Sequence, residues 1–484
     1  MQDSQTIFSH SLEENVRLIQ KLFEKDGTCK FRYFATLGDP SIACCAFFLD
    51  GMVDGQAIND SIIRPVTRWK PELKSVSSKF ISENVIQSVE LFLTPEIEKA
   101  LDGFLSGDTL VFIDGDPQVV VVDTKGFPTR SIDEPENEQS IRGPKEGFNE
   151  SIIPNLAILR RKLANHRLKY VFSVLGEKTK TKVCLIYLEG TADMRVVKEL
   201  EARLARIQID GVLDINYIQE MIRDHKWSPF KTSGVTERPD VLAAKLLEGR
   251  AAVMIDGCPA VMTVPFLFIE NFQSTDDYYN NYYFSAVSRM LRIAGFFFST
   301  VIPALYVALV TIHQEMLPTH LLLAIGAARE GVPLPTVLEA ILLLFAFEVL
   351  REAGARTPSS VGTALSIVGA LVLGQAAVEA RFVSAPMVIV VAFAGITALM
   401  ANRLQGAMLV VRFSLVLLAA ALGVYGVLIG MMLLGLHLAS LTSFGIPLIA
   451  TFSGGASRED LFIRMPWFTM KKDGRFLAQE GKNK

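Results

Sequence analysis

The chain has 484 residues, half of them hydrophobic, and a formal net charge of −3 at neutral pH. This length accommodates several domains, and the slightly acidic balance argues against general binding of nucleic acid. Apolar runs dominate from about Ile293 to Phe452, whereas the first 290 residues have the composition of a globular protein. The sequence therefore predicts a soluble α/β N-terminal half, built of two related subdomains, followed by an α-helical transmembrane region.

The N-terminal half is predicted to lie in the cytosol, with its cysteines reduced. The opening sequence, MQDSQTIFSHSLEENVRL, has no basic region followed by an apolar core, so we expect no signal peptide. Five cysteines occur mostly in apolar runs, without the spacing of metal or redox motifs. We interpret them as reduced core residues: Cys29, Cys44, Cys45, Cys184 and Cys258.

The first subdomain is predicted over residues 1–127 and opens with an amphipathic helix at Leu12–Phe23. Ala43–Gly51 is typical of a buried strand that ends in an Asp-Gly turn. The run Asp108–Thr124 has two β-rich halves around Asp114-Gly115, which predicts a hairpin. Between these elements we expect a helix beginning in Asn59–Val66, a strand at Asn84–Leu93 and a helix at Pro95–Leu105.

The same order of elements recurs in a second subdomain, predicted over residues 165–290. Lys182–Gly190 repeats the strand with its acid-Gly turn, and Leu246–Pro265 repeats the hairpin after a helix at Arg195–Ile207. The pattern IDGxPxV occurs in both hairpins, and Asp114 and Asp256 lie 142 positions apart. Because several landmarks keep nearly this offset, the sequence predicts an internal duplication with equal strand order in both halves.

Residues 128–164 separate the two subdomains as a charged linker that ends in a helix. Gly143 and Pro144 predict a turn, and we hypothesise that the charges around it contact an adjacent subunit, because fixed surface charges add little to a monomer's stability. The alternative is a solvated linker. The predicted subunit contacts are Arg142, Lys145, Glu146 and Glu150. The helix ends in Arg160, Arg161 and Lys162, which are candidates for contact with acidic headgroups or a neighbouring subunit.

No catalytic constellation occurs in the sequence. It contains no Walker loop, GxGxxG, HExxH or paired CxxC, and its six histidines show no ligand spacing. Asp276 and Asp277 precede two tyrosines and are interpreted as a solvated collar next to the membrane rather than an acid-base pair. We therefore expect neither an enzyme nor a bound metal or cofactor.

The transmembrane region is predicted over residues 291–455 with about four spans. Pro335–Gly354 is apolar but carries four charges, and we interpret it as an interfacial helix, a short buried helix being the alternative. Basic residues before the first span and in the polar tail, residues 456–484, predict a cytosolic location for both. The predicted spans are Ile293–Ile312, Val361–Val378, Met387–Ala401 and Phe413–Gly435.

These spans differ in the side chains that they present. Ile293–Ile312 is bulky and aromatic, which suits lipid contact, and Gly426-xxx-Gly430 in the last span favours pairwise helix packing. Val361–Val378 instead carries small residues at intervals near four, which favours either helix packing or the lining of a narrow pore. On the pore interpretation the helix 361–380 lines the path through Thr363, Ser366, Ala370, Gly374 and Ala377, with Leu373 forming the constriction.

Seven segments, spread in order over nearly the whole chain, resemble the A-subunit family of bacterial spore germinant receptors, the GerA family; the related stage V sporulation membrane proteins share them. Leu448 departs from the aromatic residue that many members carry at this position. The segments are RSIDEPENEQSIRGPKEGFNE, TERPDVLAAKLLEGR, ENFQSTDDYY, LYVALVTIHQEMLP, FEVLREAG, VGALVLGQAAV and LTSFGIP.

The resemblance implies a multi-pass subunit in the inner membrane of the spore. It would lie beside a transporter-like B subunit that binds the nutrient and a lipoprotein C subunit. Copies of the A subunit would form a homo-oligomeric ring in the lipid that conducts ions once nutrient binds. A non-conducting scaffold that couples the B subunit to another channel is the first alternative. A secondary transporter is the second, and the lack of a repeat between membrane halves argues against it.

Overall fold

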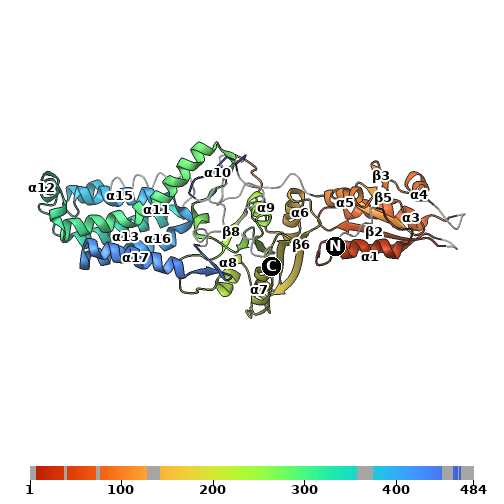
Figure 1. Ribbon diagram of the computed structural model, residues 1–484, viewed down its shortest axis with the longest axis horizontal. Coiled ribbons are helices and arrows are strands. Elements are labelled where there is room, and N and C mark those ends of the chain that lie inside the picture. Colours follow the sequence, from red (N-terminus) through yellow and green to blue (C-terminus); the bar gives the residue numbers. More distant parts are fainter. Residues whose placement is uncertain are drawn as a thin grey trace. The chain divides into compact units, whose positions relative to one another are not determined.

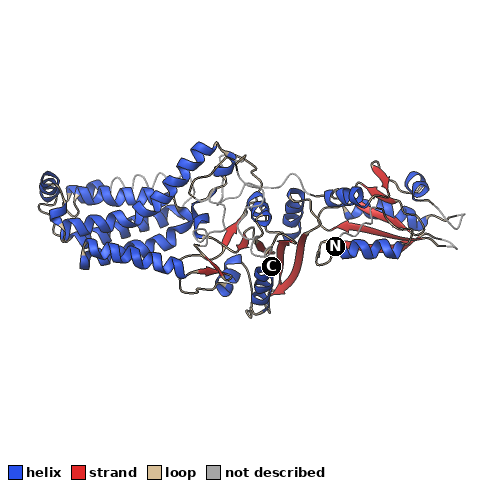
Figure 2. Ribbon diagram, viewed as in Figure 1, coloured by secondary structure: helices blue, strands red, loops and turns tan. Residues whose placement is uncertain are grey.

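The computed structural model describes residues 7–37, 41–71, 77–127, 142–356, 374–449, 460, 462–466 and 468–469. The described residues form two compact units, of which the first contains the chain up to Lys226 together with Ser233–Phe266. The second contains Trp227–Thr232 and the chain from Leu267 onward. The first unit contains two sheets together with the helices that cover them, and the second is mostly helical (Figure 2). This confirms the predicted fold class; the domain boundaries remain predictions.

The sheet unit begins with a five-stranded antiparallel sheet in the order β1-β2-β4-β5-β3 (Figure 1). Strand β4 alternates its side chains between two cores, with Leu110 and Phe112 on one face and Val111 and Ile113 on the other. The strands are β1 (Cys29–Ala35), β2 (Ala43–Leu49), β3 (Leu91–Thr94), β4 (Thr109–Ile113) and β5 (Val119–Val122). The helices are α1 (Leu12–Leu22), α2 (Gly55–Ala57), π-helical η1 (Ile58–Ile63), α3 (Arg64–Arg68), α4 (Ser78–Asn84) and α5 (Ile97–Ser106).

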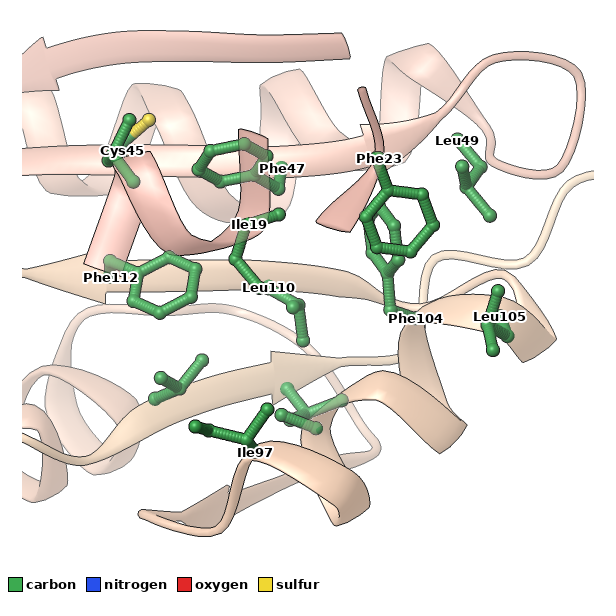
Figure 3. Close-up of a cluster of buried hydrophobic side chains, with 14 of the residues drawn as sticks. Ile19, Phe23, Cys45, Phe47, Leu49, Ile97, Phe104, Leu105, Leu110 and Phe112 are labelled. Atoms are coloured by element: carbon green, nitrogen blue, oxygen red, sulfur yellow. The ribbon is translucent and has the colours of Figure 1, made fainter. Parts of the chain in front are cut away.

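Helices α1 and α5 cover one face of this sheet because their apolar side chains recur at helical spacing. Ile19 of α1 lies against Phe47 and Leu110 of the strands (Figure 3). Phe23 packs edge-on against Phe104, with ring centroids 5.0 Å apart. Cys45 belongs to the same core, and burial raises its thiol pKa to about 12, in keeping with a reduced core residue.

A second five-stranded antiparallel sheet repeats this order as β6-β7-β9-β10-β8. The equal strand order is the outcome that the predicted duplication requires. Its strands are β6 (Leu168–Leu175), β7 (Thr181–Leu188), β8 (Gly234–Thr236), β9 (Ala251–Ile255) and β10 (Val261–Val264). Its helices are α6 (Ile152–Lys162), α7 (Met194–Ala205), α8 (Ile215–Ile222) and α9 (Pro239–Leu247).

The aspartate of each IDGxPxV hairpin caps the first helix of its own repeat. Asp114 Oδ1 accepts the backbone N–H of Leu12 at 3.2 Å, and Asp256 Oδ1 accepts that of Ile152 at 3.1 Å. These contacts satisfy N–H groups that a helix N-terminus otherwise leaves unpaired. Helix α6, which the sequence assigned to the linker, is therefore the counterpart of α1 and packs in the core of the second sheet.

Three strands of the two sheets, β1, β6 and β8, escaped the sequence analysis, and one was predicted too long. Strand β1 lacks a clear alternation of apolar and polar residues because most of it is exposed. In β6 most of the buried residues stand at consecutive positions, and β8 has only three residues. The strand expected at Asn84–Leu93 is confined to β3, since Asn84 ends the helix α4.

A buried ion pair joins the two repeats inside the sheet unit. The Arg160 guanidinium of α6 bonds the carboxylate of Asp26, and both side chains are at most 1% exposed. Arg160 also stacks over Tyr170 at 4.6 Å from the ring centroid and donates to the carbonyl of Asn165 at 3.4 Å. The expectation that Arg160 faces headgroups or a neighbouring subunit is therefore wrong, because its charge is satisfied inside the chain.

The helical unit is a bundle around α11 (Tyr282–Thr311), which contacts α13, α15, α16 and α17 (Figure 1). Its other helices are η2 (Phe268–Phe272), α10 (Asp276–Tyr279), η3 (Gln314–Met316), α12 (Thr319–Ala328), α13 (Thr336–Ala355), α15 (Ala385–Leu399), η4 (Asn402–Leu404), α16 (Gln405–Leu422) and α17 (Val424–Ser440). A short ribbon, β11 (Thr442–Ser443) with β12 (Ile446–Pro447), follows α17.

Side-chain contacts fix the direction of each helix in the bundle. Glu339 at the start of α13 bonds Ser384 at the start of α15, so these two helices begin at the same end of the bundle. This end is called the far end, and the opposite end, where α13 and α15 finish, is called the near end. His313, just after α11, bonds the backbone of Val424 at the start of α17. Helices α11 and α16 therefore run toward the far end, and α13, α15 and α17 run back to the near end.

The predicted span Phe413–Gly435 is wrong, because the chain turns back at Gly423 and forms a helical hairpin of α16 and α17. Gly423 has φ +63° and ψ −140°, a conformation open to glycine alone. A Cβ on Gly426 would lie 2.0 Å from the carbonyl oxygen of Leu418, and one on Gly430 would lie 2.5 Å from Leu415. The Gly-xxx-Gly pair thus serves pairwise packing, as predicted, against the preceding helix of the same chain.

Two further expectations for this region need correction. Helix α13 is a member of the bundle rather than an interfacial helix, since its charged residues Glu339 and Glu348 find partners inside the unit. Helix α11 is central, with Gly295, Ser299 and Ala304 buried against its neighbours, and only its remaining face, which carries exposed aromatic residues, suits lipid. Among the described residues, α11 and the run Asn402–Leu422 are long and apolar enough to cross a membrane.

Candidate functional site

The predicted pore helix lies largely outside the described residues. Gly374 and Ala377 lie on a described helical segment, residues 374–379, and both are half-buried. A Cβ on Gly374 would lie 3.6 Å from Val388 Cγ1, so the segment packs on α15. The role of this helix as pore lining stays a prediction. The predicted pore residues outside the described ranges are Thr363, Ser366, Ala370 and Leu373.

The described residues on either side of that stretch lie toward opposite ends of the bundle. Helix α13 ends at Ala355 at the near end of the bundle, and Arg356 is the next residue. Gly374 packs one turn into α15, close to the far end where α15 begins. Residues 357–373 therefore connect two points separated by much of the length of the bundle.

Glu339 holds the turn between the segment 374–379 and α15. Its side chain is fully buried, and Oε1 accepts both the backbone N–H and the hydroxyl of Ser384 at 2.5 Å. Ser384 directly precedes α15, so the carboxylate satisfies an N–H group at a helix start. A carboxylate buried in an apolar bundle is costly, which makes this contact a candidate for a functional role.

Arg412 forms a second polar centre deeper in the bundle. Its Nε donates to the carbonyl oxygen of Ser299 in α11 at 2.8 Å, and its Nη1 lies 3.3 Å from Glu348 Oε1 in α13. Arg351 Nη2 lies 2.6 Å from the other oxygen of the same carboxylate. Arg412 thus links α16 to α11 and α13, and Arg351 of α13 shares the same carboxylate.

Asp277, the second residue of the acidic pair before α11, is not solvated as the sequence predicted, whereas Asp276 is partly exposed. Asp277 is 1% exposed and accepts from Arg289 Nε at 3.1 Å and from Arg292 Nη2 at 2.5 Å. Arg289 is fully buried and also bonds Asp460 at 2.9 Å. The carboxylate is buried because two arginines of α11 neutralise it, and this joins α10, α11 and the chain near Asp460.

The predicted subunit-contact residues divide into two groups. Glu146 lies 3.0 Å from Arg161 and 2.6 Å from Lys162, so its carboxylate is used within its own chain. Burial works to raise the pKa of Glu146, but the bonds and charges of these two residues together lower it below its ordinary value. Arg142, Lys145 and Glu150 have exposed side chains. Subunit contact remains a prediction for all four residues.

Sequence reasoning missed Arg412, although a signal for it was present. It is the single charged residue of α16 and lies within the apolar run LVVRFSLVL. Such isolated charges in apolar helices mark polar partners or functional sites. In the part of the chain that the structure describes, no group of three or more His, Cys, Asp or Glu residues is placed to hold a metal ion.

The whole length of the chain resembles known proteins. Residues 17–476 match the family described as Bacillus/Clostridium GerA spore germination protein. The chain belongs to the GerA family. The spore germination protein KA of Bacillus subtilis (strain 168) is 38% identical over 481 residues, which cover 98% of this chain and 88% of that protein. The uncharacterized membrane protein YfkQ of the same organism is 38% identical over 480 residues, covering 98% and 93%.

A solved structure can be compared with this GerA-family chain as well. It is the N-terminal domain of the A subunit of the Bacillus megaterium spore germinant receptor GerK3. The match is 30% identical in sequence, has a TM-score of 0.41, and covers 54% of this chain and 97% of that chain. The match of residues 17–476 to the family model confirms the resemblance to the GerA family that the sequence motifs indicated.

Proposed function

We propose that this chain is the A-type membrane subunit of a spore germinant receptor and contributes one pore-lining helix to an oligomeric ion channel that opens when nutrient binds. Membership of the GerA family supports a role in spore germination. The observation that carries the channel mechanism is the placement of Arg356 and Gly374 toward opposite ends of the bundle. The small-residue stretch lies between these two points in the sequence, outside the described residues.

The outer surface of the helical unit supports its location in a membrane. Exposed apolar side chains occur on every helix at the outside of the bundle, and a soluble protein rarely exposes so much apolar surface. Examples are Leu342 and Phe345 of α13, Ile389 and Ile396 of α15, and Leu428 and Met432 of α17. We place the unit in the inner membrane of the spore, in contact with lipid, with the sheet unit on the cytosolic side.

The proposed partners are further copies of the chain, in a ring, together with a transporter-like B subunit that binds the nutrient and a lipoprotein C subunit. Arg142, Lys145 and Glu150 are exposed at the start of the second repeat and suit contact with a neighbouring copy. No catalytic activity forms part of this proposal.

Cysteine substitution tests the pore helix. In spores that carry Thr363→Cys, Ser366→Cys or Ala370→Cys, a charged thiol reagent applied during activation should block ion release. Leu365→Cys and Val372→Cys, on the opposite face of the same helix, are the matched controls and should not respond. Equal effects on both faces, or none on either, would leave helix packing as the role of the stripe. Absence of current from the purified receptor in planar bilayers would favour the non-conducting scaffold.

A further inference from the structure

A short loop from the middle of the second repeat belongs by its contacts to the helical unit. In the loop Trp227–Thr232, the Phe230 side chain is 2% exposed and its ring lies 6.0 Å from those of Phe268 and His437. The Ser228 hydroxyl lies 3.0 Å from His437 Nε2. Ser443 Oγ donates to the carbonyl oxygen of Thr232 at 2.6 Å. Both ends of the loop are thus fixed to the near end of the bundle.

Trp227, at the start of this fixed loop, has a relative exposure of 99%. An indole side chain is large and mostly apolar, with a single N–H donor at one edge. Full exposure to water is unfavourable for such a group, yet Trp227 lies beside Ser228 and Phe230, whose contacts fix the loop. The loop therefore presents a tryptophan to whatever surrounds the near end of α17.

The position of the loop along α17 identifies these surroundings. The outward face of α17 is apolar before its last turn, and Leu433 and Leu436 on this face are 52% and 61% exposed. His437 and Ser440 follow and end the helix. The change from apolar to polar side chains, which marks the edge of the hydrocarbon layer, thus falls beside the residue that binds Ser228.

We propose that Trp227 is a membrane-interface anchor whose ring lies among the phospholipid headgroups at the near end of α17. Tryptophan is enriched at this depth because its apolar ring meets the acyl chains while its N–H reaches water and headgroup oxygens. The anchor ties a loop of the second repeat to the lipid at the end of the bundle. The inference depends on the proposed membrane location of the helical unit but not on ion conduction.

Quenching of tryptophan fluorescence by brominated lipids tests this placement in the full-length protein. The chain has three tryptophans, so Trp69→Phe with Trp467→Phe leaves Trp227 as the sole emitter. In nanodiscs, lipids brominated near the headgroup end of the acyl chain should cause a large loss of Trp227 emission. Lipids brominated near the chain terminus should cause a smaller loss.

Two control variants separate this inference from the membrane placement itself. A variant that also carries Trp227→Phe gives the background, and Phe345→Trp in that background reports on an exposed position within α13. Quenching at Phe345→Trp without quenching at Trp227 would overturn the anchor and keep the membrane location. Quenching at neither would overturn both. Emission from Trp227 that resists both bromolipid and acrylamide would show a protein partner there, which also overturns the anchor.

Discussion

Arg160 in the sheet unit and Arg412 in the helical unit are both 1% exposed, yet their charges are balanced differently. Among the described residues, Arg160 is the single arginine paired with the Asp26 carboxylate, and its guanidinium stacks over the ring of Tyr170. Arg412 shares Glu348 with Arg351, so two cations meet one anion in an apolar bundle. The first arrangement is a charge-balanced ion pair that holds the two repeats together, here called a clamp. The second holds α11, α13 and α16 together by a less balanced contact.

The largest effect is expected from Arg160→Met, which leaves the Asp26 carboxylate buried without its cation. Removing one partner of a buried ion pair costs about 3–5 kcal/mol of unfolding free energy. Thermal unfolding of the full-length protein should show this loss in the transition of the sheet unit. Adding Asp26→Asn keeps the bonds to Thr28 and should recover part of the stability. A double variant as unstable as Arg160→Met would show that the pair is not a clamp.

Glu348→Gln should have the next largest effect, in the helical unit. Arg412 keeps the Ser299 carbonyl but loses its anion, and an uncompensated cation in an apolar helix costs about 2.5–3.5 kcal/mol. The matched control is Glu352→Gln, one turn further along α13, whose 61% exposed side chain pairs with exposed Arg356. Circular dichroism melts in detergent should separate the two variants. Equal melting temperatures would remove the proposed distinction between the two buried arginines.

Gly426→Ala tests a helix contact that involves no charge. The added methyl would meet the backbone oxygen of Leu418, which cannot move aside as a side chain can, and overpacking of this kind costs about 1–3 kcal/mol. Gly435→Ala, in the same helix, meets open space and should be neutral or slightly stabilising. The same melts distinguish them, and an unaffected Gly426→Ala variant would argue against the tight α16–α17 hairpin.

The smallest effect is expected from Glu146→Gln, because this ion pair is partly exposed and worth below about 1 kcal/mol. Since the pKa of Glu146 is lowered in the folded state, its contribution is present above the pKa of the unfolded chain. The contribution is lost as the pH falls through the folded-state value. The difference in melting temperature from the parent should therefore disappear in acid. A difference that persists there would assign the effect to packing.

The sequence predicted what local patterns encode. Apolar periodicity and the Asp-Gly turns identified α1, β2 and both hairpins, because each depends on residues that are near one another in the chain. The duplication was identified by the nearly constant offset between its landmarks. Edge strands such as β1 were missed because their exposed side chains do not alternate. The break at Gly423 was missed because it lies in an uninterrupted apolar run and depends on a backbone conformation.

The candidate site was harder to predict because its partners are distant in sequence. Glu348 and Arg412 lie 64 positions apart, and Glu339 and Ser384 lie 45 apart. When the sequence of α13 is considered without its partners, its charged residues indicate a helix at the membrane surface. Asp277 was likewise expected in water. The residues next to it in the sequence do not indicate that Arg289 bonds both Asp277 and Asp460. Pairing of this kind becomes visible only when the helices are packed.

The hairpin aspartates have a consequence for how such a protein can originate and grow. Asp114 lies near the end of the first repeat but holds its first helix, and Asp256 does the same in the second. Each repeat is therefore closed on itself, with its beginning and end in contact. A module whose two ends meet can be copied in tandem or inserted into another gene without leaving an unfinished edge. By joining the two ends of the repeat, the hairpin aspartate thus also allows the repeat to be duplicated or inserted as a complete unit.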